Sequence, residues 1–216
     1  MDRYSLIAQA TYQGIQYALY QEKKILEKSF LIKTETCRLM HEFNQLLARH
    51  TLDWSNISLI GASQGPAPFT TLRALITTLN GISFAKKIPM TGVDGLTTFY
   101  QEQQTLCPDK NVVIILNAFG NDVYYALKKN DALKTGWHNG TEFLHELTKD
   151  KTTKNYCFKG NGALLHQNLI MQLFASFNPQ QCPEHPTLES IALECFKKEK
   201  VVSQLTPLYL KTQNFK

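Results

Sequence analysis

The alternation of apolar and polar positions predicts that the chain opens with three short strands. Residues 4–10 form an apolar run, residues 15–20 alternate as a half-buried strand does, and residues 25–32 follow a polar turn. After Thr34 the apolar residues recur at every third or fourth position, which predicts an amphipathic helix over residues 34–50. The opening is therefore expected to be an antiparallel meander followed by a helix.

Residues 61–73 form the most informative stretch of the chain. They leave a short apolar run that is typical of a buried strand, and Gly65-Pro66 predicts a turn. Pro68 suits the start of a helix, because an N–H group there would have no partner within the helix. We expect a helix over residues 68–86. A helix start after a tight turn can also bind phosphate, but the Lys-Ser/Thr pair of a P-loop is missing.

From residue 88 onward the sequence pattern predicts further strands and helices. Strands are expected over residues 88–93, 112–116, 123–127 and 155–159, helices over 96–104, 141–149, 163–174 and 187–198, and an edge segment over 201–210. The polar turn at Cys107-Pro-Asp-Lys-Asn111 marks the expected boundary between a first lobe, residues 1–106, and a second lobe, residues 107–216. This order predicts an α/β fold with mixed sheets flanked by helices.

The composition indicates a globular protein but does not indicate a particular function. Hydrophobic residues make up 43% of the chain, and no apolar run approaches the ~20 residues of a membrane span. The first residues include an acid and lead into a strand, so we expect no signal peptide. The five cysteines never form Cys-x-x-Cys, which favours reduced thiols and a cytoplasmic location.

Two weaker signals carry no function by themselves. Cys182 and His185 are close in sequence, but structural zinc requires four ligands, so we expect no metal site there. The net charge of +5 is compatible with work near RNA but lacks the dense basic stripe of an RNA-binding protein.

Several motifs, in one order along nearly the whole chain, resemble the TsaB (YeaZ) family. Gly65-Pro-Ala-Pro-Phe-Thr-Thr-Leu-Arg73 is similar to that family's Gly-Pro-Gly-Ser-Phe-Thr-Gly-x-Arg, and Ile88-Pro-Met-Thr-Gly-Val93-Asp-Gly-Leu96 is similar to the Ile/Leu-Pro-x-x-Gly-Val-x-x-Leu segment that follows it. Further matches are Asn117-Ala-Phe-Gly-Asn-Asp-Val-Tyr-Tyr125 and Gly160-Asn-Gly-Ala163. Arg73 occupies the position of the family's arginine.

The resemblance implies the two-lobed actin-like fold and a scaffold role without catalysis. Members of this family are expected to pair with the related subunit TsaD, which transfers threonylcarbamoyl to an adenosine beside the anticodon of tRNA. The TsaE-type ATPase joins that pair, homodimers also form, and tRNA is reached through the complex. The resemblance therefore implies no catalytic residue, cofactor or metal site in this chain.

The alternative function is that of an ATP-dependent phosphotransferase of the sugar-kinase type. Amides at the positions where acids are expected argue against it. Gln9 stands where active members of the fold carry the Asp that holds the hydrated metal, and Asn117 and Asn161 stand where the family has Asp. Because Mg²⁺ prefers carboxylate ligands, these amides disfavour the enzyme interpretation. Asp94 and Asp122 are the nearby acids that could substitute.

The resemblance also implies a partner interface on the helices over residues 34–50 and 68–86. The candidate interface residues are Leu39, Met40, Phe43, Leu47, Phe69, Leu72, Arg73, Leu75, Ile76 and Leu79. Ordinary core packing is the competing interpretation, because each amphipathic helix must bury one face, but the apolar arcs are wider than one face. Ala67, Thr71, Leu75 and Leu79 replace small residues of the family, so we expect a wider helix spacing at the interface.

Overall fold

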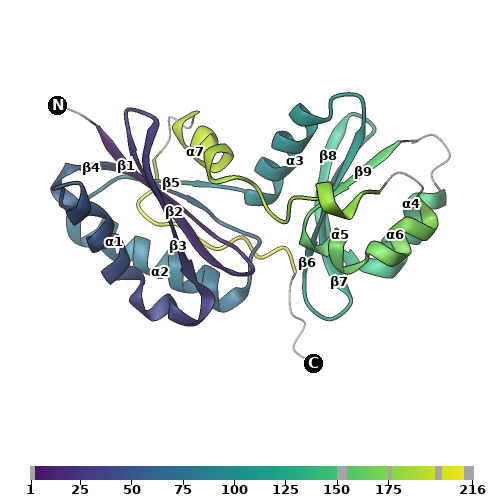
Figure 1. Cartoon of the computed structure of the whole chain (residues 1–216), viewed down its shortest axis with the longest axis horizontal. Coiled ribbons are helices and arrows are strands. Elements are labelled where there is room, and N and C mark those ends of the chain that lie inside the picture. The colour runs from purple at the N-terminus through teal and green to yellow at the C-terminus, as the bar shows by residue number, and fades with distance from the viewer. Residues whose placement is uncertain (1–2, 150–154, 175–176, 198–200, 212–216) are drawn as a thin grey trace. The chain divides into compact units, whose positions relative to one another are not determined.

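The computed structural model describes residues 3–149, 155–174, 177–197 and 201–211, which form two compact units (Figure 1). Unit 1 consists of Met1–Gly95 and Thr187–Leu208, and unit 2 of Leu96–Pro186 and Tyr209–Lys216. This division differs from the expected boundary after residue 106. The helix α3 (Gly95–Leu106) packs its apolar side into the core of unit 2, and the chain returns to unit 1 near its end.

A five-stranded sheet in the order β3-β2-β1-β4-β5 is the framework of unit 1. Its strands are β1 (Tyr4–Ala10), β2 (Gly14–Gln21), β3 (Lys24–Ile32), β4 (Ile57–Ser63) and β5 (Met90–Val93). β1 pairs antiparallel with β2 and parallel with β4. The predicted meander and the predicted buried strand before the Gly-Pro turn are therefore confirmed.

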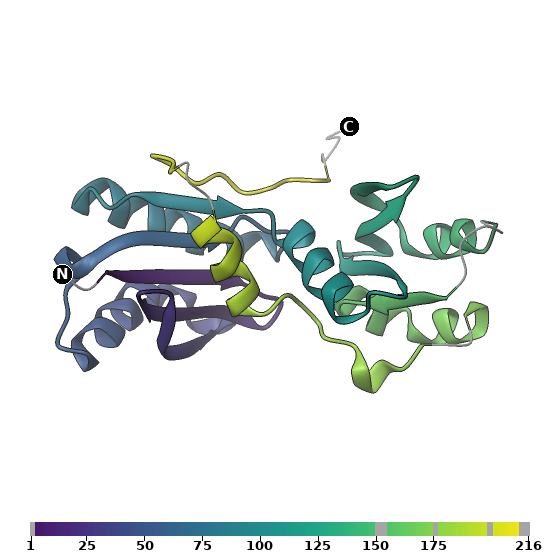
Figure 2. The same cartoon turned by 90° about the horizontal axis from the view of Figure 1, so that it is seen from above.

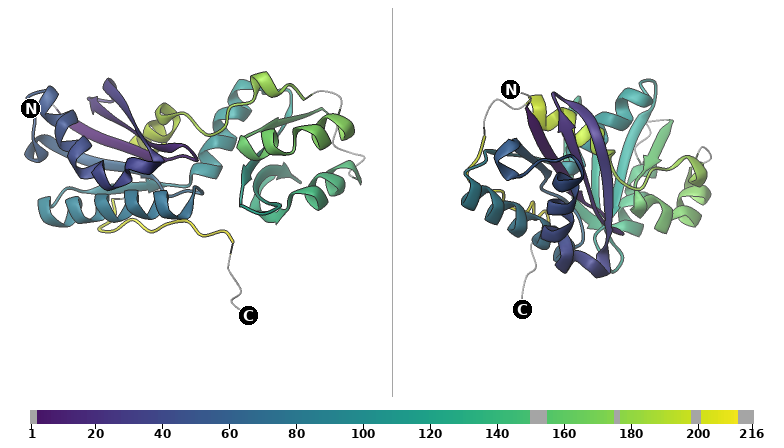
Figure 3. Two further views of the ribbon diagram at one scale, coloured as in Figure 1. Left: turned by 60° about the horizontal axis from the view of Figure 1, so that its bottom comes forward. Right: turned by 60° about the vertical axis from the view of Figure 1, so that its left-hand side comes forward.

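Helices cover both faces of this sheet (Figure 3). They are η1 (Lys33–Arg38), α1 (Leu39–Arg49), η2 (Trp54–Asn56), α2 (Phe69–Lys86) and α7 (Leu188–Lys197). Successive side chains of a strand point to opposite faces: Leu6 and Ala8 pack with α1 and α2, whereas Ile7 packs with α7. The helix expected over 34–50 begins with a 3₁₀ segment, and Lys198, the last residue expected in α7, lies outside the described residues.

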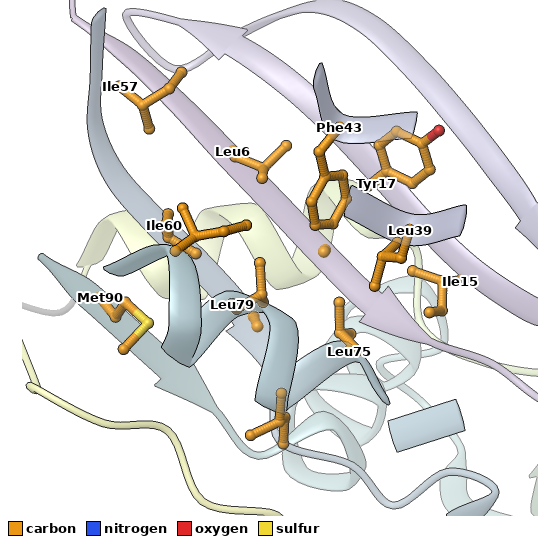
Figure 4. Close-up of a cluster of buried hydrophobic side chains, with 14 of the residues drawn as sticks. Leu6, Ile15, Tyr17, Leu39, Phe43, Ile57, Ile60, Leu75, Leu79 and Met90 are labelled. Atoms are coloured by element: carbon orange, nitrogen blue, oxygen red, sulfur yellow. The ribbon is translucent and has the colours of Figure 1, made fainter. Parts of the chain in front are cut away.

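The main core of unit 1 lies between the sheet and the helices α1 and α2 (Figure 4). Leu75 and Leu79 of α2 and Phe43 of α1 are completely buried, together with Leu6 and Ile60 of the sheet. Burial of a large apolar side chain contributes about 1.5–3 kcal/mol. This layer therefore stabilises unit 1 and fixes the sides of α1 and α2 that face inward.

The last segment of unit 1 runs beside α2 and β5 (Figure 2). Asn80 of α2 accepts a hydrogen bond from the backbone N–H of Leu205 at 2.8 Å, and its Nδ2 donates to the carbonyl of the same residue at 3.0 Å. Val202 forms an isolated bridge with Met90. The expected edge segment over 201–210 is thus held by side chains, by the bridge at Val202 and by a backbone hydrogen bond from the N–H of Leu208 to the carbonyl of Gln64 at 2.8 Å.

Unit 2 repeats the arrangement of unit 1 with a four-stranded sheet in the order β8-β7-β6-β9. Its elements include β6 (Asn111–Asn117), β7 (Asp122–Lys129), β8 (Ala132–Asn139), α4 (Gly140–Lys149), β9 (Tyr156–Lys159), α5 (Asn161–Leu165), α6 (Gln167–Leu173) and η3 (Pro179–Gln181). β6 pairs antiparallel with β7 and parallel with β9, as β1 does with β2 and β4. The duplicated arrangement confirms the expected α/β fold with mixed sheets flanked by helices.

Two local predictions for unit 2 were incomplete. β8 was not predicted, because none of its residues is fully buried and its polar composition hides the alternation of a strand. The single helix expected over residues 163–174 is broken at His166 into α5 and α6. Among the described helices, none combines the length and the hydropathy that a membrane span requires.

An ion-pair network connects β3 to the end of α1. Glu27 accepts hydrogen bonds from Nη2 of Arg49 at 2.6 Å and from Nε at 3.0 Å, and Nε2 of His50 lies 2.9 Å from the same carboxylate. The hydrogen bonds from Arg49 hold the pKa of Glu27 below its usual range, with a smaller contribution from His50. The network therefore contributes stability only while Glu27 is ionised.

We expect Glu27→Gln to lower the free energy of unfolding by about 1 kcal/mol at neutral pH. Because the folded-state pKa is depressed, the contribution is present above the unfolded-state value of about 4.3 and is lost as pH falls through the folded-state pKa. The difference between wild type and variant should therefore disappear in acid. Urea unfolding followed by Trp54 fluorescence, in a Trp137→Phe background, measures it. A difference that persists in acid, or no coupling to Arg49→Gln in a double-mutant cycle, would contradict this account.

Candidate functional site

The turn at Gly65-Pro66 positions the start of α2 at the end of β4. Gly65 has a φ of 105°, which is a backbone conformation that residues other than glycine rarely adopt. Its carbonyl accepts a hydrogen bond from the N–H of Gly95 at 2.8 Å. The helix then begins at Phe69, directly after Pro68. The predicted strand, turn and helix are confirmed.

The structure places most candidate interface residues inside the core of unit 1. The residues that are at most 3% exposed are Leu39, Phe43, Leu47, Leu72, Leu75, Ile76 and Leu79. Their positions agree with the competing interpretation, which is core packing. A partner could contact these side chains only if the core of unit 1 opened. Of the candidates, Met40 on α1 and Phe69 and Arg73 on α2 lie on the surface.

Three of the four larger residues that replace small family residues lie inside unit 1. Thr71, Leu75 and Leu79 are at most 1% exposed within unit 1, and both leucines belong to the core against the sheet. These larger side chains therefore fill the interior of unit 1, and wider helix spacing at a partner interface stays a prediction.

A continuous exposed face runs along the other side of α2. Phe69, Arg73 and Thr77 follow one another at intervals of four residues, and Gly81 and Phe84 continue on the same side of the helix. Phe69 is 53% exposed and Phe84 is 77% exposed. A Cβ atom added at Gly81 would meet nothing within 4 Å. We call these five residues the outer α2 face; an aromatic residue stands at each end, and Thr77 and Gly81 between them are small.

Both phenylalanines of the outer α2 face carry a cation over the ring. Cζ of Arg73 lies 3.7 Å from the ring centroid of Phe69, and Nζ of Lys87 lies 4.5 Å from that of Phe84. Such contacts contribute about 0.5–1 kcal/mol at exposed sites and restrict the orientation of the rings. The surface is therefore apolar with positive charge at both ends.

Sequence reasoning missed Phe84, although a signal for it was present. Phe84 follows Phe69 by 15 residues, which returns a helix to nearly the same side. The apolar residues between them occupy other sides of α2, so only the tertiary structure separates the buried arc from the exposed arc. One arc of α2, with Leu75 and Leu79, packs on the sheet. The phenylalanines Phe69 and Phe84 lie on the opposite, exposed side.

Gln9 lies inside the sheet of unit 1 and forms a hydrogen bond with the neighbouring strand. It is 1% exposed, and its Nε2 donates to Oε1 of Gln16 at 2.8 Å. A neutral amide in this position lacks the carboxylate that Mg²⁺ prefers. In the part of the chain that the structure describes, no group of three or more His, Cys, Asp or Glu residues is arranged to hold a metal ion.

The polar positions singled out in unit 2 stabilise the turn after β6. Oδ1 of Asn161 accepts a hydrogen bond from the N–H of Asn117 at 3.1 Å, and Oδ1 of Asn117 accepts from the N–H of Phe119 at 2.8 Å. Asp122 forms an ion pair with Nζ of Lys211 at 2.6 Å. All of these side chains therefore have structural partners within unit 2.

The two sides of α2 should respond differently to truncation. We expect Leu79→Ala to lower the free energy of unfolding by about 2–5 kcal/mol, because it leaves a cavity in the core. Phe84→Ala should lower it by at most about 1 kcal/mol, because the ring is exposed and loses only its contact with Lys87. Urea unfolding followed by Trp54 fluorescence measures both. Similar losses in the two variants would contradict the assignment of an inner and an outer face.

Sequence comparisons connect the chain with proteins of tRNA modification. The family model that matches residues 33–139 is TsaD, tRNA N6-adenosine threonylcarbamoyltransferase. The tRNA threonylcarbamoyladenosine biosynthesis protein TsaB of Buchnera aphidicola subsp. Schizaphis graminum is 27% identical over 153 residues, which cover 67% of this chain and 72% of that protein. TsaB of Haemophilus influenzae is 26% identical over 108 residues, which cover 50% of this chain and 46% of that protein.

Solved structures share the fold over almost the full length. YeaZ from Pseudomonas aeruginosa has a TM-score of 0.68 at 18% identity, and the match covers 96% of this chain and all of YeaZ (100%). A structure described as an uncharacterized protein with similarity to peptidase YEAZ from Pseudomonas aeruginosa has a TM-score of 0.69 at 17% identity and covers 97% of this chain. At these identities the likeness concerns the fold.

Proposed function

We propose, because this chain belongs to the TsaB (YeaZ) family, that it supports tRNA threonylcarbamoyladenosine formation as the scaffold partner of a TsaD-type transferase. The curated relatives carry the name of that biosynthesis in full, and the matching family model is that of the transferase itself. None of these names favours the alternative, an ATP-dependent phosphotransferase. The proposal includes a TsaE-type ATPase, a homodimer and tRNA reached through the complex, all in the cytoplasm.

The observation that carries the scaffold proposal is the outer α2 face. Aromatic and arginine side chains are enriched among the residues that dominate binding energy at protein interfaces. Phe69 and Phe84 supply aromatic anchors, Arg73 can pair with a carboxylate of the partner, and Gly81 allows another helix to approach closely. A partner helix that covers this face would bury both rings, which are exposed in the isolated chain.

The position of Gln9 supports a role that acts through a surface. Its amide is hydrogen-bonded to Gln16 within the sheet, and the position supplies no carboxylate for a metal-bound nucleotide. We therefore assign the transfer chemistry to the partner subunit and the ordering of that subunit to this chain.

Removal of an aromatic anchor should weaken the complex with TsaD from the same organism. We expect Phe69→Ala and Phe84→Ala each to raise the dissociation constant at least about tenfold, as truncated interface anchors commonly do. Isothermal titration calorimetry with purified TsaD measures this. The matched control is Phe119→Ala in unit 2, which removes an exposed ring (51%) outside the outer α2 face.

Two results would count against this interface. Separate elution of the two proteins at micromolar concentration in size-exclusion chromatography would contradict the scaffold role. Equal weakening by Phe119→Ala would contradict the outer α2 face as the contact surface while leaving the scaffold role intact.

The isolated chain should not bind Mg²⁺-ATP tightly, because position 9 offers an amide in place of a carboxylate. Calorimetry with ATP, in the presence of Mg²⁺ and again with EDTA, tests this. Tight binding that depends on Mg²⁺, or ATP turnover by the chain alone, would contradict the scaffold proposal and restore the phosphotransferase alternative.

A further inference from the structure

A pocket of about 410 Å³ lies between the turn of the β2–β3 hairpin and α7 in unit 1. It is on the opposite side of the sheet from α1 and α2, because α7 covers that side. Ile25, Leu193 and Phe196 give it an apolar wall, and Lys23 and Lys24 line it at the hairpin. We call it the hairpin pocket. Neither the outer α2 face nor the position of Gln9 is part of it.

A residue that lines this pocket, Tyr20, has a buried hydroxyl without a partner among the described residues. Tyr20 lines the pocket, is 3% exposed and packs edge-on against Phe196, with 5.4 Å between the ring centroids. Its hydroxyl is buried and has no hydrogen-bond partner among the described residues. Burial, and then the carboxylate of Glu189, raise the pKa of Tyr20, so the phenol stays protonated and can donate. Because buried polar groups are nearly always paired, this donor indicates an acceptor that a ligand would supply.

The charges around the pocket leave a positive excess at the hairpin. Glu189 pairs with Lys28, and Glu194 pairs with Lys197 at 2.7 Å, so both carboxylates of α7 are neutralised. Lys23 and Lys24 have no ion-pair partner among the residues that the structure describes. Their ammonium groups are therefore available to an anion that enters the pocket.

The hairpin turn that carries Lys23 is built from residues that rarely adopt its conformation. Glu22 and Lys23 have φ values of 46° and 71°, in the left-handed region. The corresponding turn between β7 and β8 uses Asn130 and Asp131, residue types that tolerate this conformation. Backbone strain of this kind is found most often at functional sites. Here the turn holds Lys23 beside the pocket.

We propose that the hairpin pocket binds a small organic anion. Its carboxylate or phosphate group would contact the ammonium groups of Lys23 and Lys24 and accept a hydrogen bond from the Tyr20 hydroxyl. Its apolar body would lie against Leu193 and Phe196. A ligand of this kind satisfies the buried donor, the two unpaired cations and the apolar wall together.

A titration of the full chain with phenyl phosphate, benzoate and benzyl alcohol tests the proposal, with ¹⁵N–¹H spectra as the readout. We expect saturable shifts for residues 20–25 and 189–197 with at least one of the two anions, and binding of the neutral benzyl alcohol at least about tenfold weaker. The anion that binds more tightly identifies the headgroup as phosphate or carboxylate.

Variants test which groups hold the anion. Lys23→Gln with Lys24→Gln should weaken binding about tenfold, and Tyr20→Phe should weaken it with the fold intact. The matched control, Lys128→Gln with Lys129→Gln, removes a lysine pair beside the β7–β8 turn and should have no effect. Shifts that do not saturate, equal binding of benzyl alcohol, or an equal loss in the control would overturn the proposal.

Discussion

The packing of α2 on the sheet of unit 1 determines what the rest of this unit can do. Leu75 and Leu79 are completely buried there, and burial of each contributes about 1.5–3 kcal/mol. That contact fixes the rotation of the helix about its axis. Once the inner side is fixed, Phe69 and Phe84 must lie on the opposite side, in solvent. The exposed aromatic face is thus a geometric consequence of the core.

The same sheet separates two surfaces with different chemistry. The side covered by α1 and α2 presents the outer α2 face, with the exposed rings of Phe69 and Phe84. The side covered by α7 holds the hairpin pocket, whose volume suits a small molecule. Because alternate residues of one strand support the two sides, a substitution on one side can be made with little change on the other. A partner and a small ligand can therefore be tested separately.

The amides that stand where the resemblance places acids take part in local hydrogen bonds. Gln9 bonds to Gln16 across two strands, and Asn161 bonds to the backbone at Asn117. Hydrogen-bonded amides satisfy the backbone and neighbouring side chains without the desolvation that a buried carboxylate requires. Loss of the acids is thus compatible with a well-ordered sheet, and the chain keeps an enzyme-like fold while acting, as we propose, through its surfaces.

The sequence by itself determined most of the order of elements, the strand, turn and helix around Gly65, and the family, because periodicity, turn residues and motifs are local properties. It did not determine which arc of α2 is buried: the pattern predicts Leu75 and Leu79 as interface residues, whereas the structure buries both, and it does not single out the exposed Phe84. It also did not reveal β8, or that α3 belongs to unit 2. These features depend on which element covers which face, and only long-range packing decides that.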